Sequence, residues 1–118
     1  MFTTRTEYAR FDPGAYDSRP VSLGEHALVQ VHLDEAIQGT AVQVLLGNGP
    51  DGTFRPSVDD DGVPIVLPFP PGWAVVILTQ ELYPGIGWFR LRTLAGSPGS
   101  YTNQPQPAAR TLMVKGVL

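Results

Sequence analysis

The chain has 118 residues, no cysteine, 8 basic and 11 acidic side chains, and a formal net charge of −3. This length predicts a single domain, and the lack of cysteine excludes disulfides, zinc–thiolate sites and cysteine nucleophiles. The slight acidic excess argues against a nucleic-acid partner, because nucleic-acid-binding domains carry a clear basic excess.

The first 22 residues differ in character from the rest of the chain. They contain the aromatic residues Tyr8, Phe11 and Tyr16 but no hydrophobic periodicity, and Pro13 and Pro20 predict turns. We therefore expect residues 1–22 to form an extended N-terminal arm rather than a strand. Its aromatic side chains would anchor it on the body of the domain or on a neighbouring subunit.

A period of two begins near residue 25. The run 27–33 alternates, which places Val29, Val31 and Leu33 on one face and Leu28 on the other. Further alternating or β-branched runs predict strands at 40–46, 53–55, 63–67, 73–79, 88–94 and 111–115. About seven to eight short strands between turns, with no helical period, predict an all-β fold. We expect residues 23–118 to form an antiparallel β-sandwich or jelly roll.

The run 88–94 carries a pair of arginines on one face. Phe89 and Leu91 point one way, while Trp88, Arg90 and Arg92 point the other. Because arginine binds carboxylates in a bidentate manner, we expect the two arginines to contact acids across the sheet or across a subunit boundary.

The motifs expected of a catalytic or metal site are missing from the sequence. There is no nucleophile elbow and no zinc-protease motif. His26 and His32 would stand roughly 20 Å apart on one strand, too far to share a metal. The acidic run 59–61 is the best cation candidate, but neighbouring side chains cannot all converge on one ion. We expect a solvated turn or a charged interface patch there, and a protein without catalytic activity, cofactor or metal.

Four aromatic residues allow a different reading. Phe54, Trp73, Tyr83 and Trp88 could line a sugar-binding face, since aromatic rings stack on carbohydrate. The alternative is that they pack as core and edge residues of the sheets.

The charges are few and unevenly placed. Only 16% of the residues are charged, against about 25% in an average domain, so the surface is covered either by another chain or by solvated Gly, Pro, Thr and Gln. Residues 34–81 carry seven acids and one base, whereas residues 82–118 carry four bases and no acid. The two segments either neutralise each other within one subunit or meet across a subunit boundary.

No targeting or membrane segment is recognisable. The N-terminal residues lack the apolar core of a signal peptide, and the longest apolar run, 73–78, is too short to span a bilayer. We expect synthesis in a cytoplasm and no membrane partner.

Several segments together carry a resemblance. They are the run Val-Gln-Val-Leu-Leu-Gly that ends at Gly47, the turn 49–54, the strand 87–92 with the Gly/Ser-rich loop after it, and the closing strand 108–112. This pattern, over roughly residues 25–117, resembles small β-sandwich structural proteins of tailed bacteriophages, in particular capsid decoration (cement) proteins. Phage neck, tail and fibre proteins share it.

The resemblance implies a virion protein without enzymatic activity that binds the outer surface of an assembled capsid and stabilises contacts between capsomers. Its partners would be the major capsid protein and further copies of itself, with a trimer favoured. The alternatives are a carbohydrate-binding β-sandwich module and a phage neck or tail component. No site residue is carried over from the family. From the residues themselves, the candidate interface positions are Tyr8, Phe11, Tyr16, Trp88, Arg90 and Arg92.

Overall fold

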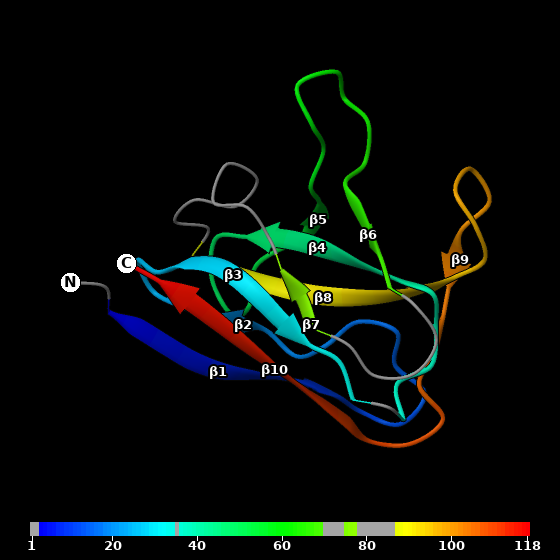
Figure 1. Ribbon diagram of the computed structural model, residues 1–118, viewed down its shortest axis with the longest axis horizontal. Coiled ribbons are helices and arrows are strands. Elements are labelled where there is room, and N and C mark those ends of the chain that lie inside the picture. Colours follow the sequence, from blue (N-terminus) through cyan, green and yellow to red (C-terminus); the bar gives the residue numbers. More distant parts are fainter. Residues whose placement is uncertain (1–2, 35, 70–74, 78–86) are drawn as a thin grey trace.

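The chain folds as two antiparallel β-sheets with no helix among its described residues (Figure 1). The computed structural model describes residues 3–34, 36–69, 75–77 and 87–118. The strands are β1 (Thr4–Phe11), β2 (Val21–Ser22), β3 (Ala27–His32), β4 (Ala41–Gly47), β5 (Arg55–Pro56), β6 (Val66–Pro68), β7 (Val75–Ile77), β8 (Trp88–Ala95), β9 (Thr102–Asn103) and β10 (Arg110–Val117). Within these ranges no helix has the length and hydropathy needed to cross a bilayer.

The smaller sheet has four strands in the order β1-β10-β3-β7. Its two longest strands, β1 and β10, pair over eight residues, from Thr4 opposite Val117 to Phe11 opposite Arg110. The first and last described segments of the chain therefore lie side by side in one sheet, as the blue and red strands show (Figure 1). Strand β1 forms one edge of this sheet.

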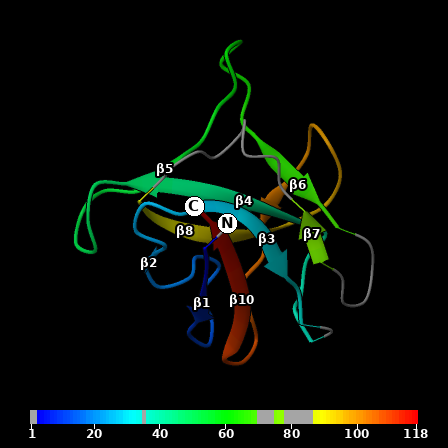
Figure 2. The ribbon, with the colours of Figure 1, turned by 60° about the vertical axis from the view of Figure 1, so that its left-hand side comes forward.

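The larger sheet has six strands, of which β2, β8, β4 and β5 form the main order. Strands β5 and β6 pair with the same edge of β4 at successive positions, Pro56 opposite Leu45 and Val66 opposite Gln43. They are two halves of one edge strand, interrupted by residues 57–65. This segment is here called the projecting hairpin. Its ends stay on the sheet, where Ser57 donates to the carbonyl of Val44 and Ile65 packs against the core, and its tip stands away from both sheets (Figure 2).

One hydrophobic core draws on both sheets. Its fully buried members share alternating positions on the inward faces of the strands, and they include Ala9, Phe11, Leu28, Val31, Val42, Val44, Phe89, Leu91, Leu112 and Val114. Burial on this scale is the main favourable term in the free energy of folding. The alternation expected for residues 88–94 is confirmed, because Phe89 and Leu91 are buried while Trp88, Arg90 and Arg92 are only partly so.

A β-bulge changes the expected faces of β3. Lys115 lies opposite Gln30, but Gly116 lies opposite Leu28, so one step along β10 matches two steps along β3. The extra residue, Val29, shifts Leu28 into the core beside Val31. This corrects the expectation that Leu28 faces away from Val31. A Cβ atom at Gly116 would lie 2.9 Å from the Cβ of His26, so the close approach at the bulge requires glycine.

The expected N-terminal arm is not confirmed. Residues 4–11 form β1, and Ala9 and Phe11 are core residues. Farther along, β2 pairs with β8, and Val21 is buried. Sequence periodicity missed β1 because most of its side chains are polar, and what makes it a strand is its pairing with β10, about a hundred residues away in the sequence.

The remaining strands match their expected positions within a few residues. The expectations at 40–46, 53–55, 63–67, 88–94 and 111–115 correspond to β4, β5, β6, β8 and β10. Of the expected strand 73–79, residues 75–77 form β7 and the others lie outside the described residues. Strands β1, β2 and β9 were not expected, so the described residues hold ten strands rather than seven or eight.

We predict that Phe11→Ala lowers the free energy of unfolding by about 3–5 kcal/mol, because it opens a cavity in a close-packed core. The side chain of Phe11 is 1% exposed. The control Val58→Ala, at a side chain that is 52% exposed, should stay within about 0.5 kcal/mol. Chemical denaturation measures both. An unchanged free energy of unfolding in Phe11→Ala would instead support an N-terminal arm that does not contribute to the core.

Candidate functional site

The outer face of the larger sheet carries the partly exposed Trp88, Arg90 and Arg92 of β8 beside buried residues of β4 and β8, among them Leu45 and Leu94. Opposite pairs on this face are Ala41 with Leu94, Gln43 with Arg92, Leu45 with Arg90 and Gly47 with Trp88. These side chains alternate with the core residues of the same strands, since successive residues of a strand point to opposite faces. The arginines that the sequence singled out therefore share one face with a set of apolar neighbours.

A groove opens at one end of this face. Its volume is about 640 Å³, within the range of about 300–1,000 Å³ that is typical of ligand sites. Strands β4 and β8 supply its floor, the base of the projecting hairpin and β6 one wall, and the loop 98–103 the other. The lining residues are Gln43, Val63, Pro64, Val66, Pro68, Leu94, Pro98, Gly99, Tyr101 and Asn103.

Gln43 is the polar residue at the floor of the groove. It is only 7% exposed, yet its side-chain amide makes no hydrogen bond with any residue in the described part of the chain. Its amide atoms are not among the buried side-chain atoms that lack a partner, so they reach the water in the groove and are free to exchange that water for a ligand. A ligand in the groove that offers one donor and one acceptor would therefore bind this amide favourably.

Proline shapes both walls of the groove. Pro64 and Pro68 lie on one wall and Pro98 on the other. The ring of proline fixes φ, so these segments lose little conformational entropy when a partner binds. The groove is thus apolar, largely preformed and open at the surface.

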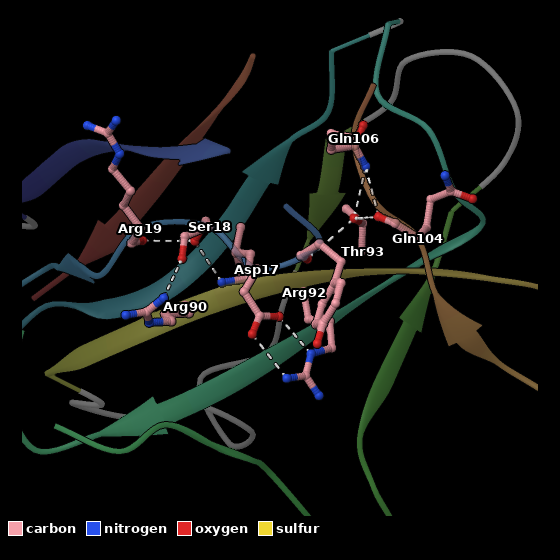
Figure 3. A network of polar contacts seen from close by, with 10 residues as sticks. Asp17, Ser18, Arg19, Arg90, Arg92, Thr93, Gln104 and Gln106 are labelled. Carbon is pink, nitrogen blue, oxygen red and sulfur yellow. Dashed lines mark hydrogen bonds and ion pairs between the residues drawn. The ribbon is translucent and has the colours of Figure 1, made fainter. Parts of the chain in front are cut away.

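Arg92 is held by a carboxylate from the N-terminal part of the chain (Figure 3). Its Nε and one terminal nitrogen donate to Asp17 at 2.6 and 3.0 Å, and the ring of Tyr16 lies 5.3 Å from its guanidinium carbon. The hydrogen bond to Asp17 raises the pKa of Arg92, and partial burial opposes this shift. The expectation that an arginine of this strand contacts a carboxylate is confirmed for Arg92, within one subunit.

Arg90 has a different environment. Its guanidinium carbon lies 4.8 Å from the ring centre of Phe54 and one terminal nitrogen donates to the carbonyl of Ser18 at 3.4 Å. Its Nε is buried and has no hydrogen-bond partner among the described residues. Phe54 packs so closely on Gly47 that a Cβ atom there would lie 2.7 Å from the ring. No carboxylate pairs with Arg90 within the described ranges.

A buried amide network fixes the segment around Gln104 and Gln106 (Figure 3). The side chain of Gln106, which is fully buried, accepts a hydrogen bond from the backbone N–H of Gln38 at 3.0 Å and donates to its carbonyl at 2.9 Å. It also donates to the hydroxyl of Thr93, which in turn donates to the carbonyl of Gln104. The connection from β8 to β10 is therefore tied to the segment before β4.

The acidic and basic segments do not neutralise each other in the described part of the chain. Its three ion pairs are Arg5–Glu7, Arg19–Asp12 and Arg92–Asp17, and all three acids come from the first 17 residues. In the acidic run 59–61, the Asp59 carboxylate accepts backbone hydrogen bonds from Asp61 and Val63 and so orders the hairpin tip. Within the described ranges no group of three or more His, Cys, Asp or Glu could hold a metal ion.

The six expected interface residues do not form one cluster. Tyr8 is exposed on β1 and Phe11 is in the core, so Phe11 is unavailable to a partner. Tyr16, Trp88, Arg90 and Arg92 lie on or beside the outer face of the larger sheet. Of the possible sugar-binding aromatics, Trp73 and Tyr83 lie outside the described residues. The groove was missed, because its lining comes from three separate parts of the sequence.

Comparison of the chain with models of protein families, with curated proteins and with solved structures finds no match.

We predict that Gln106→Leu lowers the free energy of unfolding by about 2 kcal/mol, because the backbone groups of Gln38 lose their partners. The control is Gln104→Leu, whose side chain donates only to the neighbouring carbonyl of Pro105 and should change stability by no more than about 0.5 kcal/mol. Equal effects of the two substitutions in chemical denaturation would contradict a special role for the Gln106 network.

A second prediction concerns the pKa of Asp12. The hydrogen bond from Arg19 lowers this pKa, so the pair stabilises the fold above the ordinary aspartate pKa and the contribution is lost as the pH falls through the lowered value. In Arg19→Gln, an NMR titration should show the pKa of Asp12 rising towards its ordinary value. The control Arg55→Gln should leave it unchanged, and no rise in Arg19→Gln would disprove the assigned cause.

Proposed function

We propose that this chain is a structural subunit, of β-sandwich or jelly-roll type, that binds the outer surface of an assembled phage capsid and stabilises contacts between capsomers. The sandwich is supported by the single core that both sheets share. The resemblance in strand and turn pattern supports the virion role. Binding to the major capsid protein, rather than chemistry, would then be the work of the molecule.

The groove is the observation that carries this proposal. An exposed apolar surface with a polar group at its floor is typical of protein–protein and ligand contacts. The groove meets this description, since proline and valine side chains line it and the Gln43 amide is left without a partner among the described residues. An extended segment with apolar side chains, supplied by a shell protein, would have the matching chemistry, because its peptide groups offer a donor and an acceptor.

The projecting hairpin extends this surface. Val63, on the groove wall, is 55% exposed, and Val58, on the same hairpin but outside the groove lining, is 52% exposed. A hairpin that stands away from the sheets can reach a neighbouring capsomer while the two sheets keep their shape. The low content of charged residues, 16%, suits a surface that another chain covers.

The number of copies in purified particles tests the function itself. Quantitative mass spectrometry against the major shell protein should find the chain in numbers comparable with the shell subunit. A handful of copies would favour a neck or tail component instead. Absence from the particles would overturn the virion role and its outer-surface location.

A matched pair of variants tests the groove. Val63→Glu places a charge on the groove wall. It should reduce occupancy on shells that lack the protein by tenfold or more, because the new charge would lose water on binding without gaining a partner. Leu118→Glu makes a matched change at a side chain that is 59% exposed, beside Thr3 and away from the groove and the hairpin, and should bind as the unchanged chain does. Equal occupancy for the two variants would remove the groove from the binding surface.

A carbohydrate-binding module is the second candidate. The partly buried Trp88 on the outer face and Tyr101 in the groove favour it, because both could present a ring to a sugar. A glycan array with the intact protein tests this function, and Trp88→Ala should then reduce the signal. A flat array response would exclude it.

A further inference from the structure

Strand β1 ends the smaller sheet, and its outer edge carries backbone hydrogen-bonding groups that have no partner among the described residues. The N–H of Leu118 donates to the carbonyl of Thr3. The backbone N–H and C=O groups of residue 3 and of the odd-numbered residues after it therefore point towards β10. The backbone groups of Thr4, Thr6 and Tyr8 therefore point away from the sheet. Arg10 is the exception on this edge, because its carbonyl accepts a hydrogen bond from Arg19 at 2.8 Å.

This edge is long and accessible. Thr4 and Thr6 are exposed, and Tyr8 is 48% exposed. An edge strand of such length is a template for pairing with another strand, and it is normally blocked or used. Arg5 and Glu7 lie along the same edge, paired with each other at 3.2 Å, and both side chains are about 40% exposed.

The order of charges makes this edge complementary to itself. In an antiparallel pair, two opposite residues lie on the same face, and either both are hydrogen-bonded to each other or neither is. A two-fold axis that relates two identical strands must therefore lie between one residue and the same residue of the second copy. The axis is named below by that residue. An axis at Arg5 or at Glu7 sets like charges opposite each other. An axis at Tyr8 requires the carbonyl of Arg10, which is already engaged.

The axis at Thr6 neither sets like charges opposite each other nor needs the carbonyl of Arg10. It sets Arg5 opposite Glu7 of the second copy and Glu7 opposite its Arg5. It also sets Thr4 opposite Tyr8 and Thr6 opposite itself, so all the free backbone groups of these residues find partners. An axis at Thr4 would use only the beginning of the strand.

We propose that two copies of this chain associate through β1, antiparallel and with the two-fold axis at Thr6. The two four-stranded sheets then form one continuous sheet, and cross-strand pairs of opposite charge flank its centre. Tyr8, expected from the sequence to lie in an interface, covers Thr4 of the second copy on the outward face.

This association does not depend on the proposed capsid role. It is measured in solution without any shell, and the groove lies on the other sheet. It also specifies a two-fold pair instead of the trimer that the resemblance implies.

The experiment is sedimentation equilibrium of the full chain and of two charge variants. The unchanged chain should form dimers. Arg5→Glu sets two carboxylates opposite each other in both flanking pairs, and Glu7→Arg sets two guanidinium groups opposite each other there. Each variant alone should therefore dimerise roughly tenfold more weakly or worse. Mixed in equal amounts, the two variants are complementary at all four positions and should form heterodimers.

The mixture separates pairing across the axis from the ion pair within one chain. Both variants lose the ion pair between positions 5 and 7, so recovery of association on mixing requires contact between copies in this register. Arg55→Glu changes the net charge as Arg5→Glu does, at an exposed position on the other sheet, and should leave the dimer intact.

Thr6→Pro tests the backbone pairing. Proline removes an N–H that points away from β10, so the fold should persist, as circular dichroism would show, while the dimer is lost. The proposal is overturned if the unchanged chain is a monomer or a trimer. It is also overturned if the dimer survives both charge variants, or if mixing them restores nothing.

Discussion

The structure depends on strand β8 having both of its edges hydrogen-bonded. On one side it pairs with β4 over seven residues, and on the other with β2 and with the segment at Asp17 and Ser18. A buried strand cannot leave such groups unpaired without a large cost in free energy. The segment from Asp17 to Ser22 is for this reason as much a part of the larger sheet as β4 is.

Two consequences follow for the faces of β8. Inward, Phe89 and Leu91 join the two sheets through a common core. Outward, Asp17 is brought to Arg92 and Ser18 to Arg90, which fixes long, flexible side chains on the face where the groove opens. The positions of Arg90 and Arg92 are thus fixed by the segment that pairs with the edge of β8 away from β4.

Local periodicity in the sequence was sufficient for the strands whose two faces differ. Residues 88–94 alternate between apolar and polar, and their faces were predicted correctly. The alternation of β3 is broken at Val29, because a bulge is a property of two strands and Gly116 of β10 is its other half. Strand β1 has too few apolar residues to show a period, since the core requires only Ala9 and Phe11 from it. The groove is lined by residues from three separate parts of the sequence, the first at 43 and the last at 103. No local pattern in the sequence predicts such long-range contacts.

The division of one edge strand into β5 and β6 has a further consequence. Because both halves pair with β4 in continuous order, the sheet does not constrain the length of the 57–65 segment between them. Loop closure changes slowly with length, so the fold can accommodate longer or shorter hairpins while Pro64 and Val66 keep the groove wall in place. The hairpin tip is thus a position where related chains can diverge in length, or where a foreign peptide can be displayed, without change to either sheet.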